Sequence, residues 1–183
     1  MSGSTTDIIN SAPEAIDAYR IAIENLAKLK ADTLFKNSGS SHAAIVLGNI
    51  FKSSNDSVKM IAKDFNGEVS GNPYYIEALT GFLKSNKSIT IIFEGSPNPD
   101  SKALSLLNQY RLSKPAHISL RVINKPLQVS PPNFTIGDNS MFRYETNKEV
   151  YTALCSFNDK DFVAKLDGIF NSLLEFTANY SIN

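Results

Sequence analysis

Residues 131–145 read PPNFTIGDNSMFRYE and say more about the architecture than any other part of the chain. Two short runs with strand-forming residues, 133–137 and 141–145, flank the turn Asp138-Asn139-Ser140. Asp and Asn favour turns because their side chains hydrogen-bond to nearby backbone groups. The pattern therefore predicts a β-hairpin, with charged residues at the turn and at the end of the second strand.

Two helices and a strand are expected near the start of the chain. A capping-box-like start at Ser11 precedes apolar residues spaced by three and four, which predicts an amphipathic helix of about five turns carrying Ile16, Tyr19, Ile23 and Leu26. Ser40 or Ser41 can cap a second helix with so wide an apolar surface that it should be deeply buried. Residues 58–65 have the length and apolar character of a core strand.

Two β–α–β units come next. Asn72-Pro73 opens a helix, and residues 88–93 form a continuous apolar run typical of strands buried on both faces. A helix near residues 101–110 and a strand at 117–123 repeat this pattern before the hairpin, and a strand at 150–157 and a long terminal helix follow it. We therefore expect an α/β fold with a mixed, largely parallel sheet between helical layers. The expected division is an N-terminal helical arm, 1–36, and an α/β domain, 37–183.

Composition limits the class of protein. The chain has 183 residues and is 42% hydrophobic, which is enough for one sizeable core. Its 18 basic and 18 acidic side chains cancel, so net charge does not support binding to nucleic acid. Cys155 lies in an apolar run and is expected to be a buried structural thiol. The sequence has no secretory leader and no membrane-length apolar run, so we expect a cytoplasmic protein without membrane insertion.

The element order and the hairpin resemble one half of a phospholipase-D-like fold, over most of residues 40–180. The chain is also similar to uncharacterised bacterial proteins related to that superfamily. The helix-turn-strand opening, 43–65, and the entry to the terminal helix, 157–159, support the resemblance. The superfamily motif is His-x-Lys-x-x-x-x-Asp, and counting back from Asp138 places Pro131 at the His and Asn133 at the Lys. The resemblance therefore implies a degenerate active site.

The chemistry of the family shows what these two positions lack. There, an imidazole attacks phosphorus to form a phosphohistidine, a lysine holds the nonbridging oxygens, and a second His protonates the leaving group. Neither Pro131 nor Asn133 can take these roles. No catalytic residue is expected at the motif, and the remaining ligand-binding candidates are charged residues of the hairpin and of two strand ends: Asp138, Arg143, Glu145, Lys63, Asp64 and Glu94.

These candidates have both a functional and a structural interpretation. The carboxyl ends of parallel strands commonly form a ligand crevice, where Lys63, Asp64, Glu94 and Asp138 could converge. Asp138, Arg143 and Glu145 could form a charged cluster that binds a ligand. Alternatively, the hairpin residues form an ion pair and a stabilised turn, and the strand-end residues are simply solvated.

The sequence contains two histidines. His117 opens HISLRVIN, which matches the motif spacing with Ser119 for Lys and Asn124 for Asp, so it is the alternative catalytic residue. His42 falls in the first turn of a predicted helix, where the helix dipole favours the neutral imidazole. Two scattered His and one Cys do not make a metal-ligand set, and no phosphate loop is present. We expect neither a metal nor a cofactor.

The leading hypothesis is a catalytically inactive phospholipase-D-like domain of the bacterial cytosol that binds a protein partner or a phosphate-containing ligand, or associates with itself. The alternative is a phosphodiesterase or nuclease with a site assembled across a homodimer, using His117. A third hypothesis makes the chain part of a multidomain effector, docked through its first helix. A homodimer is expected because the resemblance implies a site between two halves, and because Ile16, Ile23 and Leu26 form an apolar stripe that one mixed sheet is not expected to cover fully.

Overall fold

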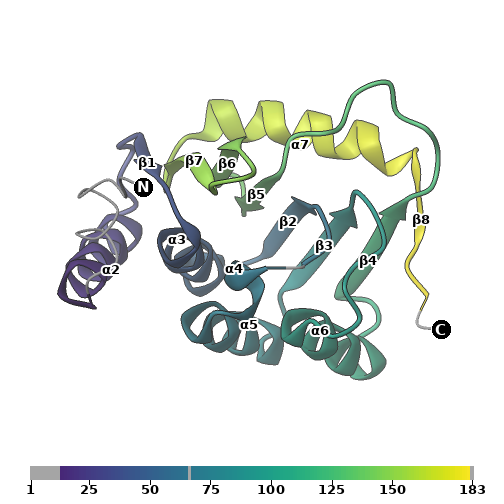
Figure 1. Cartoon of the computed structure of the whole chain (residues 1–183), viewed down its shortest axis with the longest axis horizontal. Coiled ribbons are helices and arrows are strands. Elements are labelled where there is room, and N and C mark those ends of the chain that lie inside the picture. The colour runs from purple at the N-terminus through teal and green to yellow at the C-terminus, as the bar shows by residue number, and fades with distance from the viewer. Residues whose placement is uncertain (1–12, 66, 182–183) are drawn as a thin grey trace, which may run out of the picture.

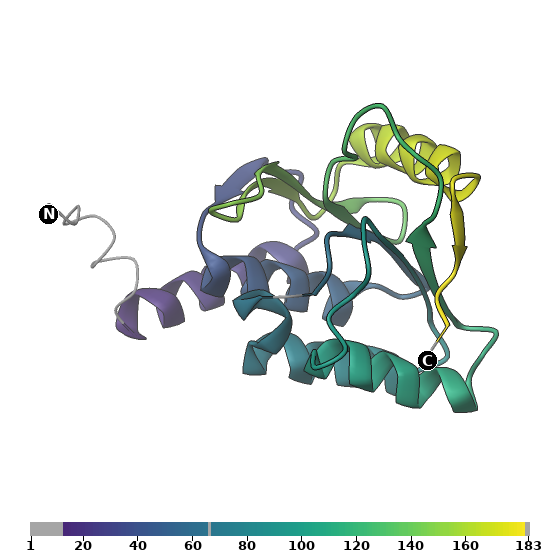
Figure 2. The same cartoon turned by 45° about the vertical axis from the view of Figure 1, so that its right-hand side comes forward.

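The computed structural model of the chain describes residues 13–65 and 67–181, so the predicted cap at Ser11 lies outside the described residues. One mixed sheet separates two helical layers (Figure 1). Helices α3 (Ser40–Ser53), α5 (Pro73–Lys84) and α6 (Lys102–Ser113) cover one face, and α7 (Lys160–Leu174) covers the other (Figure 2). The N-terminal helix α2 (Pro13–Lys28) packs beside α3. The expected α/β layering and N-terminal helix are confirmed.

The predicted strands are present within a few residues of their expected bounds. They are β2 (Ser57–Ala62), β3 (Ser88–Phe93), β4 (Ile118–Ile123), β5 (Phe134–Gly137), β6 (Met141–Asn147) and β7 (Thr152–Ser156). The sequence did not predict three short elements, β1 (Phe35–Asn37), α4 (Glu68–Gly71) and β8 (Thr177–Asn179). Each is too short to show a hydrophobic period. No helix in the described part of the chain has the length and apolar character needed to cross a lipid bilayer.

The strand order is β1-β7-β6-β5-β2-β3-β4-β8. Only the β2–β3 and β3–β4 pairs are parallel, and each is joined by a helical crossover. The other five pairings of the described strands are antiparallel. The expectation of a largely parallel sheet is therefore wrong. The reason is that the β5–β6 hairpin adds to the free edge of β2 in the opposite direction, and β7 and β1 extend that antiparallel part.

The turn of the hairpin is fixed to the start of β2. Asp138 has a left-handed φ of 50°, and its carboxylate accepts hydrogen bonds from the backbone N–H groups of Asn55, Asp56 and Ser57 at 2.9, 2.9 and 3.0 Å. Gly137 allows the close approach of α3, because a Cβ there would lie 2.7 Å from the Ile50 side chain. The turn-stabilising interpretation of Asp138 describes its contacts well.

The sheet has a hydrophobic core on each face. The larger core lies between the sheet and the layer formed by α2, α3, α5 and α6, and it includes Phe51, Leu79, Ile91 and Leu104. The smaller core lies under α7 and includes Phe134, Phe142, Leu166 and Phe170. Cys155 is fully buried in β7, as its apolar run predicted. Helix α7 starts where the Asp159 carboxylate accepts a hydrogen bond from the Phe162 N–H.

Helix α2 packs within the chain. Ile23 is buried, and the other apolar residues of its stripe, Ile16, Tyr19 and Leu26, are partly buried against the larger core. The sheet itself does not cover this stripe; α3 does, because α3 is apolar enough to contact both the sheet and α2. The stripe therefore gives no support to a homodimer. The predicted division of the chain into an arm, 1–36, and a domain, 37–183, stays a prediction. Strand β1 contains residues from both sides of this boundary, and all three pair with β7 at the edge of the sheet.

Candidate functional site

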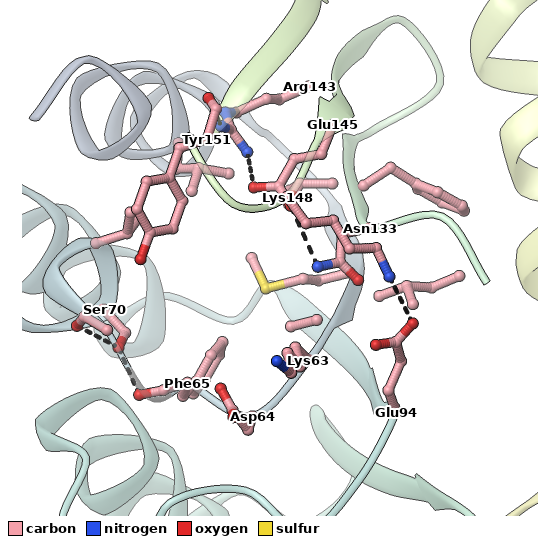
Figure 3. A pocket seen from close by; sticks show the side chains of 18 of the residues that line it. Lys63, Asp64, Phe65, Ser70, Glu94, Asn133, Arg143, Glu145, Lys148 and Tyr151 are labelled. Atoms are coloured by element: carbon pink, nitrogen blue, oxygen red, sulfur yellow. Dashed lines mark hydrogen bonds and ion pairs between the residues drawn. The ribbon is translucent and has the colours of Figure 1, made fainter. Parts of the chain in front are cut away.

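A pocket of about 610 Å³ opens at the carboxyl ends of β2 and β3, beside the open end of the hairpin (Figure 3). Five of the six sequence-predicted candidates line it: Lys63, Asp64, Glu94, Arg143 and Glu145. Lys63 and Asp64 follow β2, Glu94 follows β3, and the other two lie on β6. The expected crevice at the strand ends is therefore present, and the structure brings these five side chains together.

Arg143 is the buried cation of the pocket. Its side chain is 4% exposed and donates to Glu145 Oε1 at 2.7 Å, while Glu145 is 11% exposed. The guanidinium also donates to Asn37 Oδ1 at 3.2 Å and to the Tyr151 carbonyl at 2.9 Å. A buried charge needs such pairing, since desolvation otherwise costs several kcal/mol. The hairpin ion pair that the sequence offered as a structural interpretation is thus present, within the pocket wall.

Lys148 joins three segments at the pocket, and sequence reasoning missed it. Its Nζ donates to Glu94 Oε1 at 2.6 Å, to the Pro131 carbonyl at 2.9 Å and to Ser130 Oγ at 3.3 Å. We call this set of contacts the Lys148 bridge; it connects the end of β3, the segment before β5 and the turn after β6. No spacing in the sequence indicates it, because the three segments meet only in the fold.

The motif positions lie at the same pocket. Asn133, in the Lys position, lines the pocket and donates from Nδ2 to Glu145 Oε2 at 3.2 Å. Its Oδ1 is buried and has no hydrogen-bond partner among the described residues. Pro131, in the His position, is buried, and its carbonyl accepts from Lys148. Asn133 therefore lines the pocket without an ammonium, and Pro131 reaches the pocket wall only through its contact with Lys148.

Two aromatic residues of the pocket have unusual backbone conformations. Phe65 has a φ of 57° and Tyr151 a φ of 55°. The left-handed region costs an L-residue with a Cβ roughly 1–2 kcal/mol, and such strain clusters at functional sites. Burial raises the pKa of the Tyr151 phenol, and the negative charges of Glu68, Glu145 and Asp64 raise it further. The phenol therefore lies in a field of negative sign.

Asp138 does not join the other candidates. Gly137, which precedes it, pairs with Val58 at the start of β2, whereas the pocket lies at the end of that strand. Asp138 instead lines a second cavity, of about 830 Å³, together with the Lys59–Asp167 ion pair. The expected convergence of Asp138 with Lys63, Asp64 and Glu94 is thus not found. The hairpin is antiparallel to β2, so its turn lies at the opposite end of the sheet.

Both histidines lie away from the pocket. His117 precedes β4, whose first residue pairs with Ile89 at the start of β3, so it is roughly one strand length, about 20 Å, from the pocket end. His42 lies on α3 and stacks on Tyr19 of α2, with 3.9 Å between ring centroids. Burial lowers the pKa of His42. Neither imidazole can act within this chain on a ligand bound in the pocket.

Cys155 has a structural environment. Burial raises the pKa of its thiol to about 12, and Sγ donates to Asn37 Oδ1 at 3.3 Å. The thiolate needed for nucleophilic attack is therefore strongly disfavoured. Among residues 13–65 and 67–181, no group of three or more His, Cys, Asp or Glu side chains has an arrangement able to hold a metal ion.

Comparison with known proteins identifies the fold. No family model matches the sequence, and no curated protein matches it. Among solved structures, the phospholipase D family member Nuc from Salmonella typhimurium matches with a TM-score of 0.59 and 15% identity, covering 82% of this chain and 100% of Nuc. NucT from Helicobacter pylori matches with a TM-score of 0.59 and 14% identity, covering 81% of this chain and 100% of NucT.

A third match is to a protein described by its binding. TrmBL2, an archaeal chromatin protein with a novel mode of DNA binding, matches with a TM-score of 0.56 and 14% identity. The match covers 96% of this chain and 68% of TrmBL2. At such identities a structural likeness shows the fold alone. The matches to Nuc and NucT show that this fold is phospholipase-D-like, as the sequence resemblance indicated.

Proposed function

We propose that this phospholipase-D-like chain binds a small ligand in the pocket at the ends of β2 and β3, and does not hydrolyse phosphodiesters through a covalent histidine. One observation carries the proposal: Asn133, which the sequence predicts at the motif's Lys position, lines that pocket, and Pro131, predicted at the His position, accepts a hydrogen bond from the lining residue Lys148. The whole sequence has two histidines, and neither lines the pocket. The cavity is present, and the nucleophile is not.

The pocket side chains cannot replace the missing chemistry. A proline carbonyl is not a nucleophile towards phosphorus, and the Asn133 amide carries no charge to hold nonbridging oxygens. Lys148 brings an ammonium close to Pro131, but Glu94 neutralises it. The pocket therefore lacks both the attacking group and an unpaired cation at the motif.

Several features support a binding role. The volume lies within the roughly 300–1,000 Å³ typical of ligand pockets. Strained backbone at Phe65 and Tyr151, together with the buried Arg143–Glu145 ion pair, gives the pocket wall a defined geometry. TrmBL2 provides a precedent for this fold in a protein described by its binding. DNA itself is a poor candidate for this chain, because the formal net charge is zero.

Hydrolysis assays test the proposal. Bis(p-nitrophenyl) phosphate and DNA should show no turnover above the buffer rate with the wild-type chain, and no phosphohistidine should be trapped. The matched variant is His117→Ala. Reproducible turnover that this substitution abolishes would overturn the proposal and favour the alternative, a phosphodiesterase or nuclease assembled across a homodimer.

The homodimer is a separate part of that alternative. It rests on the resemblance, since family sites lie between two halves and a second copy would have to bring its own His117 to this pocket. Light scattering over a tenfold concentration range measures the mass directly. A constant mass near 20.1 kDa, that of one chain, would contradict the homodimer and remove the route to a shared site.

A further inference from the structure

We infer that the ligand of this pocket is a small organic cation, carrying a primary ammonium or guanidinium group, instead of a phosphate. The inference rests on the proposed function, because it assigns a chemical class to the ligand of the same pocket. It follows from the charges of the lining, from a buried acceptor left without a donor, and from the way the chain's own ammonium is bound there.

The lining carries one more negative than positive side chain. Its cations are Lys63, Arg143 and Lys148, and its carboxylates are Asp64, Glu94, Glu145 and Glu149. Glu145 pairs with Arg143, and Glu94 pairs with Lys148. Among the described residues of the lining, Lys63 is the one cation that forms no salt bridge. An incoming phosphate would therefore find one cation without a salt bridge, in a lining that also contains four carboxylates. The net negative charge of the lining attracts a positively charged ligand.

The pocket also contains a buried hydrogen-bond acceptor that has no donor among the described residues. The buried Oδ1 of Asn133 has no donor among the described residues, although its neighbouring amide nitrogen is held by Glu145. Glu94 is half-buried, and its Oε1 accepts hydrogen bonds from Lys148 Nζ and Ser130 Oγ. Leaving the buried Asn133 oxygen without a donor destabilises the pocket wall, and a ligand that supplies a donor removes this penalty. An ammonium or guanidinium brings donors and no acceptor.

The Lys148 bridge shows how this pocket binds an ammonium. A carboxylate, a hydroxyl and a backbone carbonyl contact the same Nζ, at the position where the family motif calls for His. The carboxylate and the carbonyl would repel an anion, and the Ser130 hydroxyl already donates its proton to Glu94 Oε1 at 2.6 Å. Tyr151 and Phe65 add aromatic rings to the lining, and such rings attract cations through their π faces.

Calorimetric titration with three classes of probe tests the inference. Agmatine and putrescine are the cations, inorganic phosphate and glycerol 3-phosphate the anions, and glycerol the neutral probe. The wild-type chain should bind the cations, more weakly as sodium chloride rises, and should bind the anions at least tenfold more weakly.

Charge variants sharpen the titration. Lys63→Gln removes a like charge and should raise the affinity for agmatine about three- to tenfold, whereas Glu149→Gln should lower it by a similar factor. The control variants Lys84→Gln and Glu77→Gln make the same charge changes on exposed residues of α5 outside the lining. They should leave the affinity for agmatine within about twofold of the wild-type value. Circular dichroism of each variant confirms that it folds.

The outcomes separate this inference from the proposed function. If phosphate or glycerol binds in this pocket more tightly than either cation, the inferred ligand class is wrong. The proposed small-ligand binding function would still hold in that case. Cation binding that ignores Lys63→Gln and Glu149→Gln would place the cation elsewhere and also overturn the inference. If no probe of any class binds at millimolar concentration, the inference and the small-ligand function both fail.

Discussion

The two ends of the β5–β6 hairpin differ in how closely they follow the phospholipase D motif. At the turn, Asp138 matches the motif and its carboxylate accepts three backbone hydrogen bonds. At the open end, Pro131 and Asn133 depart from the motif and contact Lys148 and Glu145 instead. Asp138, which matches the motif, therefore has a structural role. Pro131 and Asn133, which differ from the motif, stand at the positions that the resemblance assigns to the catalytic His and Lys.

This difference separates what the fold requires from what the reaction requires. The hairpin needs an acceptor for the N–H groups at the start of β2, and Asp138 provides it in this chain. The family reaction needs an imidazole and an ammonium at the pocket. The fold itself needs neither group. The fold alone therefore does not decide the activity, and function has to be argued from the site.

Arg143→Ala should have the largest effect, at the pocket end. It leaves Glu145 as a buried charge without its partner, so we expect a loss of about 3–5 kcal/mol in the free energy of unfolding. Urea denaturation followed by circular dichroism measures it. The double variant Arg143→Leu with Glu145→Leu removes both charges and should lose less. A loss below about 1 kcal/mol for Arg143→Ala would show that solvent reaches this pair.

Asp138→Ala should have the next largest effect, at the turn end. Three backbone N–H groups lose a charged acceptor, for which we expect a loss of about 2–3 kcal/mol in the same assay. Asp138→Asn is the matched control, because it keeps one acceptor oxygen and tolerates the left-handed backbone. Equal stability of Asp138→Ala and wild type would contradict the architectural role.

Lys148→Ala should cost little stability and open the pocket. The Lys148–Glu94 pair is partly exposed, so the expected loss is about 0–1 kcal/mol. Removing the bridge releases the segment before β5 from β3, and limited proteolysis should then cut near Ser130 faster than in wild type. Unchanged cleavage would show that other contacts hold this segment.

His42 should give the smallest effect and serves as a reference distant from both ends. Because burial lowers its pKa in the folded chain, the unfolded chain binds a proton more readily. The stability that its neutral stacking on Tyr19 provides is present above about pH 6.5 and is lost as the pH falls through the lower folded pKa. Unfolding curves of wild type and His42→Gln between pH 7.5 and 5 measure it. Parallel pH profiles would contradict this assignment.

Local sequence patterns predicted the longer elements because each depends on neighbours within a few residues. The period of α2, the β-branched run of β3 and the turn chemistry at Asp138 are of this kind. The patterns did not predict β1 or β8, which are strands only because β7 and β4 offer them free edges. They also gave the wrong sheet character, since pairing direction depends on which edge the hairpin joins.

For the site, the sequence by itself determined which charged residues end the strands, and it predicted that Pro131 and Asn133 stand at the motif's His and Lys positions, because both statements follow from residue identity and spacing. Only the tertiary structure decided which of them meet. Five candidates lie at one pocket and Asp138 lies at the other end, because an antiparallel hairpin reverses direction against β2. Lys148 joins Glu94 across 54 residues, a contact that depends on three-dimensional packing and leaves no pattern along the chain.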